Sequence, residues 1–511
     1  MKPQPDSQVS SSPPEATHDL KDKTVTGVLW NTVARAGQQA MQFGLSVILA
    51  RLLLPDDFGA VGMVMVIVTF MSMAVDAGFA PALVQRTHIS ESHLDSVFWF
   101  NVVTGVALCG LFFAGAPLVA AFYREPSLAA MTRGLSAVFV LSAAGLVPAA
   151  LMQRRLQFHL VARISLIATF VSGVTGVVLA FLGAGVWSLV VMYLASFGIS
   201  TVLNLLFSGW HPGRAFRLSS LRELWGFSGN VLGFNFVNYW ARNADNLLVG
   251  KYLGPAALGF YSRAYGLMLM PITQVIGVIS NVMLAALSTI QQDRARVKSI
   301  FLRAVGLISL LVFPMMIGLL VVAEPFVRAL FGENWAGMIP TVQILALVGV
   351  MQALSNPTGW LYLSQGRTDW YFRWGVVRAV VLVGAIVLGV VLGTIEAVAA
   401  CYAVANLLLL YLDISIPGRL VGMTFRDLLG SIAGPLAGAT VMGLSVYGLG
   451  RLLPDNVPQW QQLALLCVAG VLIYGAFVVG LRLSAWLEAV TLLREWLGRR
   501  SRSSVAPGPV E

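Results

Sequence analysis

Apolar stretches of membrane-spanning length recur along the whole chain, separated by short polar turns. A helix needs about 20 mostly apolar residues to cross a bilayer, and these stretches reach that length or slightly exceed it. They lack the alternation of apolar and polar residues that a membrane β-barrel needs. The sequence therefore predicts an all-α polytopic membrane protein with about fourteen transmembrane helices. The predicted spans are 27–51, 58–83, 96–121, 130–152, 158–182, 184–208, 226–250, 257–287, 300–322, 338–363, 371–393, 395–416, 429–450 and 460–482.

The seventh span carries polar residues inside an otherwise apolar helix. Its five polar positions are Asn235, Asn238, Arg242, Asp245 and Asn246. In a helix they share one face, over an arc of about 100°. An arginine at bilayer depth costs at least about 2.5 kcal/mol, so such residues face a bundle interior or a watery cavity. We therefore expect this face to line a cavity.

The first span repeats this pattern at positions smaller by 200. The aligned pairs are Arg35 with Asn235, Gln38 with Asn238, Gln42 with Arg242, Ser46 with Asn246, Arg51 with Lys251, Pro55 with Pro255 and Gly59 with Gly259. Further along, Pro117 aligns with Pro325 and Phe158 with Trp370 as the offset grows. The chain is therefore interpreted as a duplication. Six spans make each copy, and an even number gives parallel repeats related by a pseudo-twofold axis along the membrane normal.

This duplication gives the expected domain organisation. The ranges are a disordered cytoplasmic tail over 1–25, an N-lobe over 26–208, a cytoplasmic linker over 209–224, a C-lobe over 225–420, two further spans within 421–483, and an amphipathic helix with a cytoplasmic tail over 484–511. The first tail is rich in Pro, Ser and charge and lacks the apolar core of a signal peptide.

Composition supports a membrane protein. Hydrophobic residues make up 57% of the chain and charged residues only 11%, far below the quarter that is typical of soluble domains. The net charge of +10 arises mainly from segments on one side of the predicted spans, which places both termini in the cytoplasm by the positive-inside rule. No nucleic-acid partner is needed to explain it.

The predicted cavity has a cationic and amide character. Arg35, Arg242 and Arg263 supply positive charge, and arginine suits phosphate through paired hydrogen bonds. Amides both donate and accept, as sugar hydroxyls require. The amide positions are Gln38, Gln39, Gln42, Asn235, Asn238, Asn243 and Asn246. A ligand with a diphosphate and a glycan fits such a lining better than a cation does.

Two membrane carboxylates, Asp76 and Asp245, are candidates for proton or sodium coupling. Two alternatives stay open: Asp76 caps a helix broken before Pro81, and Asp245 pairs with Arg242 three residues before it. We expect no metal, no cofactor and no enzymatic activity, because no Walker loop, zinc-protease motif or metal-ligand spacing of Cys and His occurs in the sequence. Transport would then be driven by a gradient, by the substrate or by a partner.

Three stretches also resemble a known family. They are ILARLLLPDDFGAVGM within 27–63, DAGFAPALVQR at 76–86 and DNLLVGKYLGPAALGFYSRA at 245–264. They are similar to the Wzx-like polysaccharide exporters of the MOP superfamily, in particular to those of colanic-acid and teichuronic-acid type, and the resemblance covers about 20–480. It implies a MATE-like fold of two lobes around a central cavity. It also implies flipping of an undecaprenyl-diphosphate-linked oligosaccharide, such as a lipopolysaccharide or exopolysaccharide unit, across the inner membrane.

Three alternatives remain at this point. A multidrug or cation exporter of the same superfamily would need carboxylates in its first span, which has none. A lipid II flippase would share the fold and the arginines. A scaffold for a polymerase or glycosyltransferases would need only the cytoplasmic loops. Beyond such enzymes, the expected partners are the lipid-linked oligosaccharide and membrane lipids.

Overall fold

The computed structural model describes residues 37–491 except 87, 455, 484–485 and 488–489, and it describes only the helical backbone at 227, 230, 231, 234, 237, 241 and 281. The first helix occupies residues 37–52. The first half continues with α2 (Pro55–Asp76), α3 (Phe79–Gln85), α4 (Glu91–Ala114), α5 (Ala116–Tyr123), α6 (Leu128–Leu135), α7 (Ala137–Arg154), α8 (Phe158–Phe181) and α9 (Trp187–Phe207).

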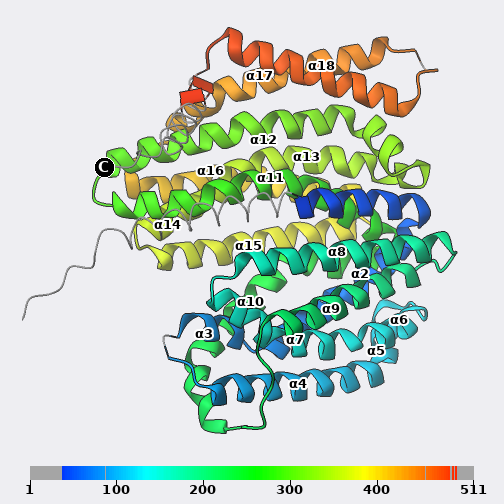
Figure 1. The fold of residues 1–511 in the computed structure, drawn as a ribbon. Helices are drawn as coiled ribbons and strands as arrows, with labels where there is room; N and C mark the ends of the chain where they lie inside the picture. Colours follow the sequence, from blue (N-terminus) through cyan, green and yellow to red (C-terminus); the bar gives the residue numbers. More distant parts are fainter. Residues whose placement is uncertain (1–36, 87, 455, 484–485, 488–489, 492–511) are drawn as a thin grey trace, which may run out of the picture.

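The second half repeats this layout and adds a helix pair. Its elements are α10 (Leu218–Leu253), α11 (Pro255–Thr289), α12 (Arg294–Leu330), η1 (Glu333–Met338), α13 (Ile339–Ser355), η2 (Asn356–Thr358), α14 (Gly359–Ser364), α15 (Thr368–Val391), α16 (Ile395–Val421), α17 (Phe425–Leu452) and α18 (Gln459–Gly480). Helices α2 to α9 form one group, α11 to α16 a second, and α17 with α18 packs on α12 at the outer side of the second group (Figure 1).

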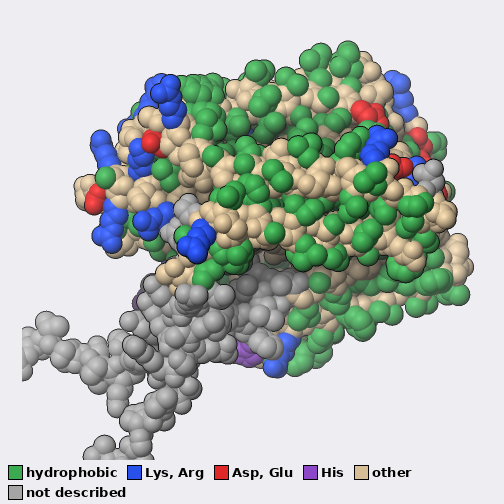
Figure 2. Space-filling model, turned by 90° about the horizontal axis from the view of Figure 1, so that it is seen from above, with side chains coloured by type: hydrophobic (Ala, Val, Ile, Leu, Met, Phe, Trp, Pro, Cys, Tyr) green, Lys and Arg blue, Asp and Glu red, His purple; other side chains and the backbone are tan. Residues whose placement is uncertain are grey.

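Apolar composition explains why these helices lie side by side. Twelve spans in the described part of the chain are long and apolar enough to cross a membrane. Charged side chains gather at the two ends of the helices, and the band between them is hydrophobic on the face shown in Figure 2. The chain is therefore a multi-pass membrane protein, and no strand occurs among the described residues.

The predicted fold class is confirmed. Each of the fourteen predicted spans coincides with a helix or a run of adjacent helices in the described chain. Two of the fourteen lie outside the twelve strongly apolar spans: the first helix, described only from residue 37, and α10, which carries the polar face. The predicted tail over 1–25 lies outside the described residues, as does most of 484–511, so the amphipathic helix stays a prediction.

Some spans are interrupted for visible reasons. The span predicted over 58–83 divides into α2 and α3 at Ala77 and Gly78, whose φ angles are 47° and 75°. The carboxylate of Asp76 accepts a hydrogen bond from the amide of Ala80 at 2.8 Å, so it satisfies an otherwise unpaired donor at the start of α3. The capping interpretation of Asp76 is thus seen in the structure.

The two halves meet at one end of the molecule through reciprocal glycine contacts. A Cβ on Gly59 would lie 1.7 Å from the carbonyl oxygen of Pro255, and one on Gly259 would lie 2.1 Å from that of Pro55. These four residues are two of the pairs that align at an offset of 200. The seam between α2 and α11 is therefore pseudo-twofold symmetric, and we call this end of the molecule the sealed end.

Cationic residues repeat the same symmetry beside the seam. The Nε of Arg51 donates to the carbonyl of Leu330 at 2.9 Å. The aligned residue Lys251 lies 4.4 Å from the centre of the Phe122 ring. Because Pro117 aligns with Pro325, Phe122 and Leu330 also occupy equivalent positions in the two halves. Each half thus contacts the end of the other through a basic side chain.

At the opposite end, the linker before α10 is bound to the first half. The backbone amide of Arg217 donates to Ser96 Oγ at 2.8 Å, and that of Gly213 donates to Asp95 Oδ1 at 2.9 Å. Helix α10 begins at Leu218, within the linker predicted over 209–224. Its first turns therefore follow the first half, although they precede the second half in sequence.

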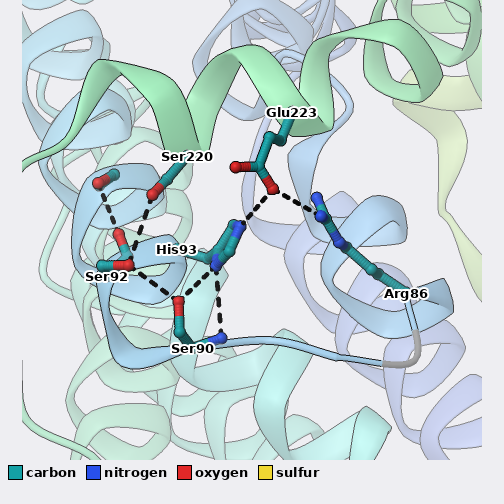
Figure 3. Close-up of polar contacts among 7 residues, drawn as sticks. Arg86, Ser90, Ser92, His93, Ser220 and Glu223 are labelled. Atoms are coloured by element: carbon teal, nitrogen blue, oxygen red, sulfur yellow. Dashed lines mark hydrogen bonds and ion pairs between the residues drawn. The ribbon is translucent and has the colours of Figure 1, made fainter.

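A small polar cluster, the Glu223 clasp, strengthens this attachment (Figure 3). The Glu223 carboxylate accepts a hydrogen bond from Arg86 at 2.6 Å and lies 3.3 Å from Nε2 of His93. Nδ1 of His93 lies 2.6 Å from Oγ of Ser90, the N-cap residue of α4. The hydrogen bonds from Arg86 and His93 hold the pKa of Glu223 below its ordinary value.

Candidate functional site

A cavity of about 470 Å³ lies between the two halves, behind the sealed end. The first helix, α2, α9, α10 and α11 supply nearly all of its walls. Its polar lining residues are Gln39, Gln42, Ser46, Thr69, Tyr193, Tyr239, Asn243, Asn246, Ser262 and Arg263. Arg263 is the one charged residue among the described residues that line it.

Arg263 projects from α11 toward the floor of the cavity. Its guanidinium donates to Ser46 Oγ at 2.7 Å and lies 4.1 Å from the centre of the Phe58 ring. Helical side chains point toward the helix N-terminus, which for α11 is the sealed end. The cation is therefore held at the deep end of the cavity by one hydroxyl and one aromatic face.

Amide and hydroxyl groups form the walls above this cation. Gln42 and Ser46 come from the first helix, and Asn243 and Asn246 come from α10. The Nδ2 of Asn243 donates to the backbone of its own helix at Tyr239, which leaves its carbonyl oxygen free to accept. Donors and acceptors thus come from both halves of the duplication.

The structure brings together only part of the predicted site. Gln42, Asn246 and Arg263 line the cavity. Gln38 is half-buried and donates to Thr169 of α8 at 3.3 Å, so it faces a neighbouring helix. Arg35 lies outside the described residues.

The remaining residues of the α10 stripe lie elsewhere on that helix. Arg242 and Asn238 are exposed and Asn235 is half-buried, and none of the three is part of the cavity lining. The carboxylate of Asp245 is 5% exposed and accepts from the Tyr261 hydroxyl at 3.2 Å. Its described partners are therefore Tyr261 and the backbone, rather than Arg242.

Sequence reasoning missed the aromatic floor of the cavity. Phe58 and Phe331 both line it. Phe58 packs edge-on against Trp335 at 5.3 Å between ring centres. Large aromatic residues are common in membrane helices, so nothing in the sequence alone distinguishes these rings from ordinary packing.

A second polar group was also missed, in the interior of the second half. The Asp413 carboxylate, on α16, accepts from Trp374 at 2.7 Å and forms an ion pair with Arg378 at 3.2 Å. Arg378 also donates to Asn406 at 3.1 Å. The sequence signal was a lone Asp near the end of the twelfth predicted span, together with an Arg within the eleventh.

The sequence of the chain matches a known family over this same region. Residues 48–340, more than half of the chain, match the polysaccharide biosynthesis protein family. The chain belongs to this family. The match includes the seam and every described helix that lines the cavity except the first, whose lining residues all precede residue 48.

Curated relatives cover most of the chain. The succinoglycan biosynthesis transport protein ExoT of Rhizobium meliloti is 31% identical over 74% of this chain and 77% of its own length. The teichuronic acid biosynthesis protein TuaB of Bacillus subtilis is 26% identical over 79% of this chain and 84% of its own. The lipopolysaccharide biosynthesis protein WzxC of Escherichia coli is 28% identical over 72% and 76%.

Solved structures with the same fold come from two groups of transporters. The lipid II flippase MurJ in an inward closed conformation has a TM-score of 0.69, with 14% identity over 89% of this chain and 99% of its own. An inward-facing multidrug resistance MATE family transporter of the MOP superfamily has a TM-score of 0.58, with 14% identity over 76% and 98%. The MATE-like arrangement predicted from the sequence is therefore confirmed at the level of the fold.

Proposed function

We propose that this chain is a flippase that moves an undecaprenyl-diphosphate-linked oligosaccharide across the cytoplasmic membrane by alternating access. The observation that carries the proposal is the cavity lining: among its described residues, one cation, Arg263, is surrounded by amides and hydroxyls contributed by both halves. The curated relatives support it, since their names assign them to the synthesis or transport of polysaccharides. The protein acts in this proposal as a transporter and not as an enzyme.

The chemistry of the cavity favours an anionic glycolipid head group. A guanidinium binds phosphate oxygens through charge-assisted hydrogen bonds, which are stronger in a dry site than in water. Gln42, Asn243 and Asn246 can each donate to and accept from sugar hydroxyls. The polyprenyl tail would remain in the lipid while the head group crosses.

The arrangement of the two halves favours alternating access. The cavity is closed on one side by the glycine seam of the sealed end. In parallel-repeat transporters the two halves rock about a site near the pseudo-twofold axis. We place the Glu223 clasp and both chain termini on the cytoplasmic side, in line with the distribution of basic residues.

Two other functions receive less support from the same lining. A cation exporter would need a carboxylate facing its cargo, and no described residue that lines the cavity is acidic. A lipid II flippase would carry the same diphosphate, but the curated relatives named above are polysaccharide proteins. Coupling to protons or sodium at Asp245 or Asp76 remains part of the proposal, as does docking of a polymerase or glycosyltransferases.

The deciding experiment is leaflet translocation of a short diphosphate-linked glycolipid in proteoliposomes, with proton and sodium gradients imposed in turn. We expect the wild type to move it, and we expect Arg263→Met to lose about 10- to 100-fold in rate, because a hydrogen bond between charged groups is removed. Arg242→Gln should keep most of the rate, because Arg242 lies outside the lining.

The controls distinguish a loss of head-group binding from a general effect of removing an arginine. Arg133→Ala removes an exposed arginine of α6 that lies near the Phe113 ring and outside the cavity lining, and it should transport normally. Equal transport by wild type and Arg263→Met would exclude Arg263 as the head-group site. Failure of the wild type under every gradient would overturn the flippase proposal itself.

A further inference from the structure

The floor of the cavity joins the proposed head-group site to the sealed end. Phe58 lines the cavity, yet it is only 6% exposed, because Arg263 covers one face of its ring. The same ring makes an edge contact with Trp335, at 5.3 Å between ring centres. Phe58 therefore contacts both the cation of the cavity and an aromatic ring of the sealed end.

Trp335 is anchored more firmly than Phe58. It is fully buried in η1, and its Nε1 donates to the backbone carbonyl of Ala50 in the first helix at 2.7 Å. The rings of Phe331 and Phe260 pack around it, each at 6.0 Å between centres. Trp335 thus extends from the second half of the chain into the first.

These contacts cross between the halves on one side of the pseudo-twofold axis only. Phe58 belongs to the first half, whereas Arg263 and Trp335 belong to the second. At the offset of 200, Leu258 occupies the position of Phe58 and Met63 occupies that of Arg263. The seam is therefore symmetric at its glycines, whereas the contacts of Phe58 with Arg263 and Trp335 are asymmetric.

We propose that Arg263, Phe58 and Trp335 form a latch that keeps the sealed end closed until an anionic head group enters the cavity. In the structure the guanidinium lies on the Phe58 ring, a cation–π contact. Phosphate oxygens are stronger partners for a guanidinium than a neutral ring is. A bound diphosphate draws Arg263 away from the floor, and Phe58 then loses the cover that holds it against Trp335.

Because of the latch, the ligand has different affinities for the closed and the open conformation, which any ligand-driven transition requires. Arg263 cannot satisfy the ring and a diphosphate fully at once, so the ligand binds the unlatched state better. Loading of the site therefore opens the sealed side. This inference rests on the proposed function, because the ligand is the diphosphate of the proposed cargo, but the mechanical role of Phe58 can be tested without any ligand.

The test is a distance measurement across the sealed end by double electron–electron resonance. Spin labels are attached at Ser127→Cys and Leu452→Cys, two exposed positions next to α6 and at the end of α17, after Cys109, Cys401 and Cys467 are replaced by serine. The protein is the full chain in lipid nanodiscs. The ligand probe is inorganic pyrophosphate, and its binding to the same sample is measured by calorimetry.

In the wild type without ligand we expect mainly a short distance between the labels. A small population at a longer distance should increase when pyrophosphate is added. Phe58→Leu copies the residue of the other half and should raise the long-distance population about 30-fold without ligand, the factor that a desolvated cation–π contact is worth. Trp335→Phe removes the hydrogen bond to Ala50 while keeping a ring, so it should act in the same direction. Arg263→Met should abolish the response to pyrophosphate.

Different outcomes test the latch and the proposed function. Arg133→Ala is the matched control, since it removes another arginine–phenylalanine contact and should leave the distances unchanged. Unchanged distances in both Phe58→Leu and Trp335→Phe would overturn the latch even if pyrophosphate binds. Absence of pyrophosphate binding to the wild type would contradict the diphosphate site of the proposed function, whereas the ligand-free result for Phe58→Leu would still decide the mechanical role.

Discussion

The two halves of this chain match at the seam and differ at the cavity floor. At the seam, Gly59 and Gly259 each contact the backbone of the proline that begins the opposite helix. One turn deeper, the first half has Met63 where the second has Arg263. A pseudo-twofold contact requires a small residue in both halves, because each glycine packs against the proline of the opposite half. The described lining has a cation from the second half, whereas the aligned residue of the first half is apolar, so the symmetry is broken there.

A second difference lies inside the lobes. The second half contains the ion pair of Arg378 with Asp413, whose carboxylate is almost fully buried. At the offset that aligns Phe158 with Trp370, the first half has Leu166 in place of Arg378. At the same offset Thr201 stands in place of Asp413, so the first lobe has no ion pair at these aligned positions, and the two lobes should respond differently to the loss of a polar residue.

The largest expected effect tests that ion pair. Asp413→Ala leaves the Arg378 guanidinium without its carboxylate inside the second half, which should lower the free energy of unfolding by about 3 kcal/mol. The measurement is a denaturant titration in mild detergent. The matched control is Asp369→Ala, which breaks the exposed pair with Arg367 on α15 and should leave the unfolding free energy unchanged. Equal effects of the two variants would show that the pair is not a structural element of the second lobe.

The seam gives the next largest effect and should be symmetric. Gly59→Ala and Gly259→Ala each place a Cβ within 2.1 Å of a carbonyl oxygen, so the helices must separate, at a cost of about 1–3 kcal/mol each. Gly277→Ala in α11 meets open space and is the control. Thermal unfolding of the three variants checks this. A strong effect of one seam variant without the other would contradict the reciprocal contact.

The smallest expected effect concerns the Glu223 clasp, through which the first half holds the start of the second. Because its pKa is lowered in the folded protein, Glu223 contributes stability above its ordinary pKa, and this contribution disappears as pH falls through the lowered value. The difference in melting temperature between wild type and Glu223→Gln should shrink as the pH falls below about 4. A difference that grows on acidification would contradict the sign of the shift.

Much of the fold could be predicted from the sequence because the membrane leaves few choices. Backbone polar groups must pair within a helix in lipid, so apolar length gives the spans, and the repeated residues Pro55 and Pro255 give the duplication. The polar stripe on α10 indicated a cavity but not which of its residues face it. Arg242 is exposed and Asp245 is buried against Tyr261, although both lie on the predicted face.

What the sequence determined by itself was therefore the class of the protein, its duplication and a short list of polar residues in apolar helices. Only the tertiary structure decided that Arg263 is the one charge among the described residues of the cavity lining, that Phe58 and Trp335 pack at its floor, and that Asp413 pairs with Arg378. The physical reason is that periodicity reports which face of a helix is polar, whereas the rotation and depth of that helix depend on contacts with residues far away in sequence.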